Sequence, residues 1–221
     1  MTTSTSFAAF STDAWMRSFV RSARAAKDRL TSLDQEVGDG DFGINLSAGA
    51  HATLRRLDAA SASRGDPAAP LHAAATAFLD EVGGTSGPLF GLLFQSLAVA
   101  VADAGAATTT SLAAGSVEGL AAIRRVGDAA PGDKTLVDAL GPAADALRAA
   151  PPGAPPEQAL SRAAEAAWDG VSETARLRAR LGRSSYLGER AEGVPDPGAV
   201  GIWLLFASAR AVVDDLSARL G

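Results

Sequence analysis

Hydrophobic and polar positions recur with a period of three to four residues along most of the chain, which is the repeat of an amphipathic α-helix. In the first such segment Trp15, Phe19 and Leu30 fall on one face. A helix is therefore predicted from Ser11 or Thr12 to about Leu33, with the hydroxyl residue as its N-cap. Strand-like alternation is nearly absent and aromatic residues make up 5% of the chain, so the pattern favours an all-α fold.

The same periodicity predicts one domain of about eight helices over residues 1–221. The later helices are expected at about Asp41–Leu57, Leu71–Val82, Pro88–Ala104, Ser111–Val126, Asp133–Ala150, Glu157–Leu181 and Gly198–Leu220. The segment Pro151–Pro156 is interpreted as a loop between helices and not as a domain linker. Glycines concentrate in three other segments between helices, and there we expect the chemistry.

Composition narrows the function classes. The chain has 25 acidic and 20 basic side chains, a formal charge of −5 and no cysteine. The absence of a basic stripe argues against a nucleic-acid partner, and the lack of cysteine excludes disulfides and thiolate metal sites. The longest apolar run, Pro88–Val101, is shorter than the roughly 18 residues of a membrane span, and the N-terminus has no signal-peptide pattern. A soluble, cytoplasmic protein without a membrane partner is expected.

The first glycine-rich segment, Leu33–Asn45, carries Asp34, Asp39 and Asp41 within eight residues. Three unpaired carboxylates held side by side would repel one another, and at least one would be driven to protonate. A hard divalent cation such as Mg²⁺, which takes oxygen ligands and bridges carboxylates to phosphate, removes that repulsion. The segment therefore predicts a metal site.

Other interpretations of this segment are weaker. Gly38, Gly40 and Gly43 complete a G-x-G-x-x-G pattern, but no strand precedes it as a dinucleotide site requires. A calcium loop beginning at Asp39 would need glycine where Ile44 stands. The remaining alternative is an acidic turn that caps the second helix through Asp41.

Two further segments could meet an anion. Gly83–Gly91 carries Thr85 and Ser86 at the start of an apolar helix, which suits either an anion cradle or a plain N-cap. Gly182–Arg190 carries Arg183 and Arg190, which could bind phosphate oxygens or form a solvated surface loop.

Taken together, five segments resemble the L subunit of dihydroxyacetone kinase, which is the nucleotide-binding component of that enzyme. The segments are Asp34–Asn45, Gly83–Gly91, Pro131–Thr135, Gly182–Arg190 and Asp196–Ala199, in this order. The resemblance implies an eight-helix barrel with ADP or ATP bound at one rim. It also implies that Asp34, Asp39 and Asp41 hold two Mg²⁺ ions and that Arg183 assists phosphoryl transfer.

The same resemblance implies a set of residues that line the nucleotide. These are Phe42, Gly43, Ile44, Asn45, Thr85, Ser86, Gly127, Leu136, Arg183, Asp196, Pro197 and Gly198. Some relatives carry histidine or threonine where this chain has Phe42, which is harmless if that residue contributes its backbone.

In this family the ketose is bound covalently by a histidine of a separate K subunit, so the resemblance implies that the chain is inactive alone. Its phosphoryl donor is either ATP or a phosphotransferase-system protein that rephosphorylates bound ADP. The partner selects the short ketose. Two other functions stay open at this point: a Mg²⁺-dependent phosphatase, and a nucleotide-loaded module that regulates a transcription factor. A homodimer is a further assembly that we consider.

Overall fold

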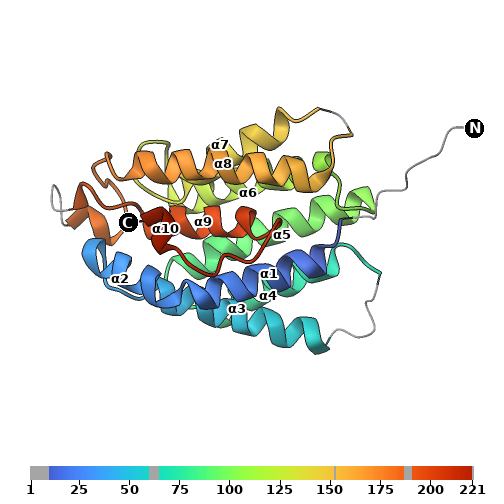
Figure 1. The fold of residues 1–221 in the computed structure, drawn as a ribbon, viewed down its shortest axis with the longest axis horizontal. Helices are drawn as coiled ribbons and strands as arrows, with labels where there is room; N and C mark the ends of the chain where they lie inside the picture. The colour runs from blue at the N-terminus through green and yellow to red at the C-terminus, as the bar shows by residue number, and fades with distance from the viewer. Residues whose placement is uncertain (1–9, 60–64, 152, 187–190, 221) are drawn as a thin grey trace, which may run out of the picture.

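The computed structural model describes residues 10–59, 65–151, 153–186 and 191–220. Every regular element in these residues is helical, which confirms the predicted all-α fold (Figure 1). The elements are α1 (Thr12–Ala25), α2 (Lys27–Val37), α3 (Phe42–Ala59), α4 (Ala69–Glu81), α5 (Ser86–Ala104), α6 (Thr109–Gly127), α7 (Val137–Arg148), α8 (Pro156–Thr174), the 3-10 helix η2 (Arg183–Tyr186), α9 (Pro197–Ala207) and α10 (Ser217–Leu220).

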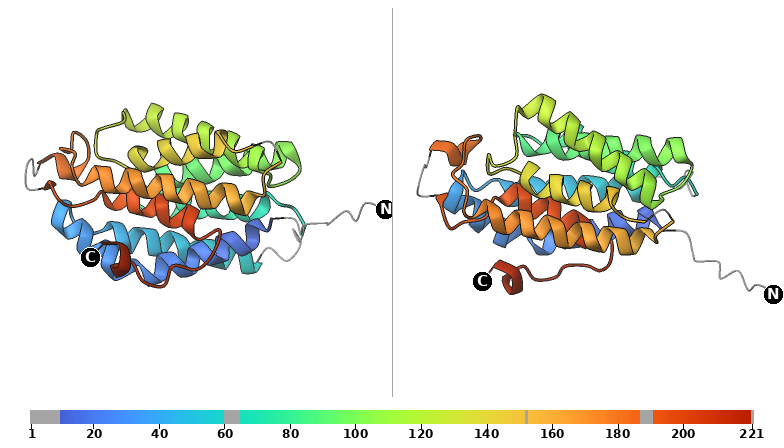
Figure 2. Two further views of the ribbon diagram at one scale, coloured as in Figure 1. Left: turned by 45° about the horizontal axis from the view of Figure 1, so that its top comes forward. Right: turned by 90° about the horizontal axis from the view of Figure 1, so that it is seen from above.

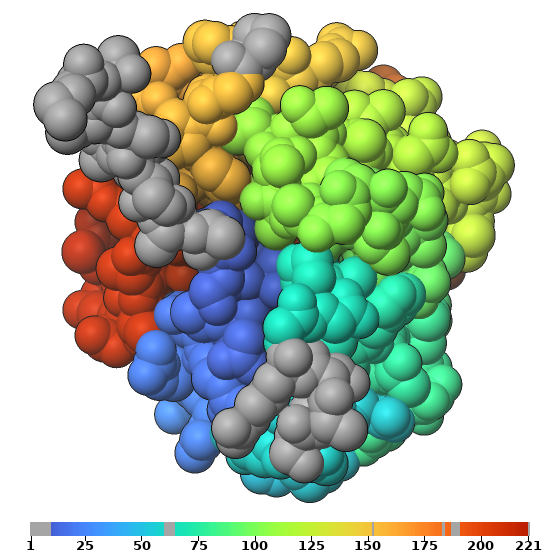
Figure 3. Space-filling model, turned by 90° about the vertical axis from the view of Figure 1, so that its right-hand side faces the viewer, coloured from blue at the N-terminus to red at the C-terminus, as the bar shows by residue number. Residues whose placement is uncertain are grey.

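The long helices lie side by side, and helices that follow one another in the chain pack together from α3 to α8. Seen end-on, the chain runs in order around the molecule (Figure 3). Helix α9 contacts α1, α2, α3, α7 and α8. Nearly all of its residues are buried, which explains why its sequence is apolar on every face.

Aromatic side chains fill the centre of the bundle. The ring of Phe94 lies 5.3 Å from that of Phe78 and 5.7 Å from that of Phe19. Phe90 extends this cluster to Phe42, at 6.2 Å, at the start of α3. The hydrophobic core therefore reaches the end of the bundle at which α3 begins.

Three predicted helix boundaries are corrected. The first helix, predicted to reach Leu33, is broken at Ala26 into α1 and α2. One turn before the break, the buried hydroxyl of Ser22 donates to the Ser18 carbonyl, and such back-bonding bends helices. It also accepts hydrogen bonds from the Ser208 hydroxyl and from the N–H of Val213.

Helix α9 ends at Ala207 and not at Leu220, because the following chain crosses to α1 to make these bonds to Ser22. Helix α8 ends at Thr174 and not at Leu181. The Thr174 carbonyl accepts hydrogen bonds from the N–H of Leu177, three residues on, and from the ammonium of Lys134.

Helix α5 is longer than the apolar run predicted from the sequence. Among the described residues it is the one helix long and apolar enough to span a membrane by length and composition. In the structure α5 packs between α4 and α6, with Phe90, Leu93 and Phe94 buried.

Candidate metal and nucleotide site

The end of the bundle where α2 ends and α3 begins is at the left of Figures 1 and 2. The residues at this end line a pocket of about 390 Å³. Five separate chain segments meet there. Its lining residues are Asp34, Gly38, Asp39, Asp41, Phe42, Gly84, Thr85, Ser86, Leu89, Ile123, Gly127, Ala129, Lys134, Thr135, Leu136, Val137, Leu181, Gly182, Ser184, Asp196, Pro197 and Gly198.

The acidic side of this pocket is formed by three carboxylates. Asp34 belongs to the last turn of α2, while Asp39 and Asp41 lie in the turn before α3. One carboxylate oxygen from each residue lies within 4.8 Å of the others. Asp34 is only 9% exposed, whereas Asp39 and Asp41 reach solvent. We call these three residues the aspartate cluster.

The backbone of the turn is built around Asp34. Its Oδ2 accepts a hydrogen bond from the N–H of Phe42 at 3.0 Å. A Cβ atom at Gly38 would lie 2.4 Å from Asp34 Oδ1, so only glycine fits beside the carboxylate. Gly40 has a φ of 77°, in the left-handed region that glycine adopts without strain.

The electrostatics of the cluster suit a cation. Burial raises the pKa of Asp34, and the neighbouring charges of Asp39 and Asp41 raise it further, against the lowering by the Phe42 N–H. A divalent ion would favour the ionised form of all three groups. Three carboxylates that converge from a short turn are a donor set that Mg²⁺ accepts, so the residues fit the metal that the sequence predicts.

The opposite side of the pocket is the N-terminus of α5. Thr85 occupies the N-cap position, but its side chain makes no capping hydrogen bond. The predicted alternative, a plain N-cap by this residue, is therefore wrong. The first N–H groups of this 19-residue helix receive no hydrogen bond from the Thr85 side chain, and a helix N-terminus of this kind favours an anion. A Cβ atom at Gly84 would lie 3.5 Å from the amide nitrogen of Asn45, which links α3 to this wall.

A third wall comes from the start of α9. Asp196 is its N-cap, with Oδ2 accepting from the N–H of Ala199 at 2.7 Å. Desolvation raises the pKa of Asp196 to about 7, against the opposing effects of the Ala199 N–H and the Lys134 ammonium. Pro197 and Gly198 complete this wall.

Most of the residues predicted to line the nucleotide reach this pocket, but Gly43, Ile44 and Asn45 do not. Gly43 is buried against α2, where a Cβ atom would lie 2.2 Å from the Lys27 carbonyl oxygen. Ile44 is 51% exposed. The side-chain amide of Asn45 lies near Gly84 but does not line the pocket. Arg183 begins η2, but its side chain, like all of Arg190, lies outside the described residues. The Phe42 ring packs on Phe90, so its backbone N–H is what it offers the cluster.

Sequence reasoning missed Lys134. Its side chain is 1% exposed, and Nζ donates to the carbonyls of Thr174 and Val194, the latter at 2.7 Å. Desolvation lowers its pKa, which Asp196 and Glu192 oppose. The signal was present, since Lys134 is one of only two lysines and lies in the segment Pro131–Thr135.

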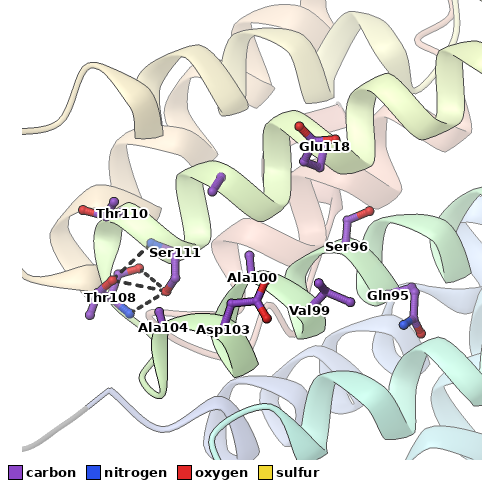
Figure 4. Close-up of a pocket in the computed structure, with 11 residues that line it drawn as sticks. Gln95, Ser96, Val99, Ala100, Asp103, Ala104, Thr108, Thr110, Ser111 and Glu118 are labelled. Atoms are coloured by element: carbon purple, nitrogen blue, oxygen red, sulfur yellow. Dashed lines mark hydrogen bonds between the residues drawn. The ribbon is translucent and has the colours of Figure 1, made fainter.

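A second hollow, of about 660 Å³, lies between α5 and α6 (Figure 4). Its hydroxyl groups at Thr108 and Ser111 already cap α6. Its carboxylates, Asp103 and Glu118, come from different helices and do not belong to the one group of potential metal ligands in the described residues. This hollow has less to offer a metal or a phosphate than the first pocket.

The family model of the DAK2 domain matches residues 36–211. The chain belongs to the DAK2 domain family. It is 37% identical over 179 residues to the ADP-binding subunit DhaL of PEP-dependent dihydroxyacetone kinase 2 from Listeria innocua, which covers 81% of this chain and 83% of that protein. The resemblance to the L subunit is therefore confirmed, and the chain is a DhaL-type member of the family.

Larger proteins contain a related region. D-erythrulose kinase of Mycolicibacterium smegmatis is 35% identical over 190 residues, which cover 86% of this chain but only 32% of that protein. Among solved structures, the native dihydroxyacetone kinase of C. freundii matches with a TM-score of 0.68 and 25% identity, over 95% of this chain and 37% of that one. The all-helical fold is thus the one found in that kinase.

Proposed function

We propose that this DAK2-domain protein is the phosphoryl-donating subunit of a dihydroxyacetone-type kinase, and that it binds ADP or ATP with two Mg²⁺ ions. The observation that carries the proposal is the aspartate cluster, which opens into a pocket opposite the uncapped N-terminus of α5. The description of the Listeria relative as an ADP-binding subunit supports it.

In this proposal Asp34, Asp39 and Asp41 hold the metal, which would neutralise phosphate charge in the transition state. The N–H groups at Thr85 and Ser86 receive phosphate oxygens, because a helix N-terminus favours an anion. Arg183 supplies a further positive charge to the phosphates.

The nucleoside lies against the less polar part of the pocket. That part is formed by Gly127, Leu136, Pro197 and Gly198. The backbone from Phe42 to Asn45 holds the turn that carries the aspartates. Phosphoryl transfer needs mainly positioning and charge neutralisation, and these elements provide both.

The sugar is held elsewhere in this proposal. A separate K-type subunit binds the ketose, and the chain transfers the phosphoryl group only when the two proteins meet. The PEP-dependent relative favours a phosphotransferase-system donor that rephosphorylates bound ADP, with direct use of ATP as the other route. Both routes would take place in the cytoplasm, where these donors occur.

Reconstitution tests the proposal. The chain is mixed with a K-type subunit and dihydroxyacetone, with either ATP or the phosphotransferase components and PEP as donor, and triose phosphate is measured. We expect no product from the chain alone, product with the K-type subunit, and a loss of at least about a hundredfold in Asp39→Ala and Asp41→Ala.

Glu36→Ala is the matched control, since this exposed carboxylate lies close in sequence but outside the cluster. Full activity of both aspartate variants would contradict the proposal. Release of phosphate from ATP without any partner would favour a phosphatase instead.

A further inference from the structure

Lys134 bears two unfavourable features at one residue. Its ammonium group is buried, with 1% of the residue exposed, and burying a charge is unfavourable unless it is bonded. Its φ is 62°, in the left-handed region that side chains with a Cβ avoid. Such conformations persist where the surrounding structure demands them, and they cluster at functional sites.

The hydrogen bonds of Lys134 explain why it adopts this buried and left-handed conformation. Nζ donates to the carbonyl of Thr174, the last residue of α8, and to the carbonyl of Val194, two residues before the Asp196 cap. The positive charge of the same ammonium group lowers the pKa of Asp196, against the larger effect of desolvation. One side chain therefore joins both ends of the segment 175–196, which connects α8 to α9.

Two further hydrogen bonds close the base of this segment. The N–H of Asp196 donates to Thr174 Oγ1 at 2.9 Å, and the N–H of Gly193 donates to the Ala175 carbonyl at 2.8 Å. Thr174 Oγ1 itself donates to the Val171 carbonyl. We call this set of contacts the loop base.

The pocket wall stands on the loop base. Leu181, Gly182 and Ser184 line the pocket from inside the segment, and the turn 196–198 lines it at the end of the segment. A displacement of the base would move both parts of the wall relative to the aspartate cluster, which belongs to α2 and the turn before α3.

We propose that Lys134 is a positioning residue of the nucleotide pocket, which acts by clamping the loop base through the Thr174 and Val194 carbonyls. The inference rests on the proposed function, because it assigns to Lys134 the placement of one wall against bound Mg²⁺–ADP. A lysine that served only to fill the core would affect the stability of the whole fold, without a specific effect on the loop base or on nucleotide affinity.

The test compares Lys134→Met with the wild type in two measurements. Methionine keeps the length of the side chain but removes the charged donor from both carbonyls, so that the Thr174 carbonyl keeps only the N–H of Leu177. Without ligand, we expect amide hydrogen exchange at Gly193 and Asp196 to accelerate about tenfold or more beyond any change at core amides of α5, since a hydrogen bond to a charged group is lost. With Mg²⁺–ADP, calorimetry should show a dissociation constant raised by about tenfold or more.

Lys134→Arg keeps the charge and several donors, and it should recover part of both effects. Thr53→Val is the matched control, because Thr53 is fully buried and donates to the Gly49 carbonyl within α3. It should leave the exchange at the loop base and the affinity unchanged. If Lys134→Met does not fold, Lys134→Gln replaces it, since glutamine removes the charge that bonds to both carbonyls but keeps a polar donor.

Equal exchange of loop-base and core amides in the variant would overturn the inference, as would an unchanged affinity in a folded variant. A failure of the proposed function would give a different result, because the wild type itself would then not bind Mg²⁺–ADP. The exchange measurement needs no ligand, so it would still test whether Lys134 holds the loop base.

Discussion

Asp34 joins the helical frame to the acidic turn. Its carboxylate is anchored by the Phe42 N–H on one side and is pressed against Gly38 on the other. Asp39 and Asp41 lie in the turn, so the site presents one buried carboxylate and two exposed ones. In our account the exposed turn can adjust its position to the cation, while Asp34 fixes the position of the site relative to α2.

Asp196 gives the pocket wall a pH-dependent stability. Desolvation raises its pKa from 3.8 to about 7 in the folded protein. Between these values the folded state keeps a proton that the unfolded chain has lost. Stability from this residue is therefore present at low pH and declines as pH rises through the window, by at most about 1.4 kcal/mol per pH unit.

Asp196→Asn removes the titrating group but keeps an oxygen for the Ala199 N–H. Urea unfolding of both proteins between pH 4.5 and 8 gives their free energies of unfolding as a function of pH. We expect the two free energies to differ least near pH 4.5 and most above pH 7, because only the wild type loses stability from this residue as pH rises. Parallel curves across the whole range would show that Asp196 does not titrate in this way.

The sequence was sufficient to find the aspartates but not Lys134. Asp34, Asp39 and Asp41 lie within eight residues, so their proximity is visible in the chain itself. The acceptors of Lys134 are backbone carbonyls 40 and 60 residues away. Every residue has a backbone carbonyl, so the residue types do not indicate which carbonyls accept from Lys134. These groups come together only in the folded structure.

At the scale of elements, the start of α3 is held against α2 by a close approach at Gly43. A Cβ atom there would lie 2.2 Å from the Lys27 carbonyl oxygen and 2.5 Å from Thr31 Oγ1. The family resemblance implied a place at the nucleotide for Gly43, whereas the structure gives it a packing role that sets where the turn begins.

Gly43→Ala should therefore separate α2 from α3. Overpacking of this kind costs about 1–3 kcal/mol, which corresponds to a fall of roughly 2–12 °C in the melting temperature of a domain this size. Gly83→Ala is the control, since a Cβ atom there would meet nothing within 4 Å and the φ of Gly83 is not left-handed. Scanning calorimetry on the two variants measures the difference, and equal melting temperatures would contradict the packing role.

The helices themselves could be predicted because their apolar stripes are local signals. The predicted and observed bounds agree closely for α5, at Pro88–Ala104 against Ser86–Ala104. Their ends were less predictable where a distant group decides them. The Thr174 carbonyl at the end of α8 accepts from Lys134, 40 residues away, and Ser22 bonds to the chain that follows α9.

At the scale of the whole molecule, the bundle gathers four loops at one end, which connect α2 to α3, α4 to α5, α6 to α7 and α8 to α9 and are spread from residue 34 to residue 198. The family model spans most of these loops, from residue 36 to residue 211. A nucleotide bound as we propose would contact several helices through these loops, so its binding should stabilise the entire fold and not one segment alone.

The central claim, that nucleotide is held through metal on the aspartate cluster, is tested most directly by thermal melting with ADP alone, Mg²⁺ alone and both together. Ligand at 100 times its Kd adds roughly 2.7 kcal/mol to the folded state, or about 5–10 °C here. We predict that shift only for the pair, its loss in EDTA, and a smaller shift for Asp34→Asn. A shift with ADP alone as large as that with the pair would contradict the account.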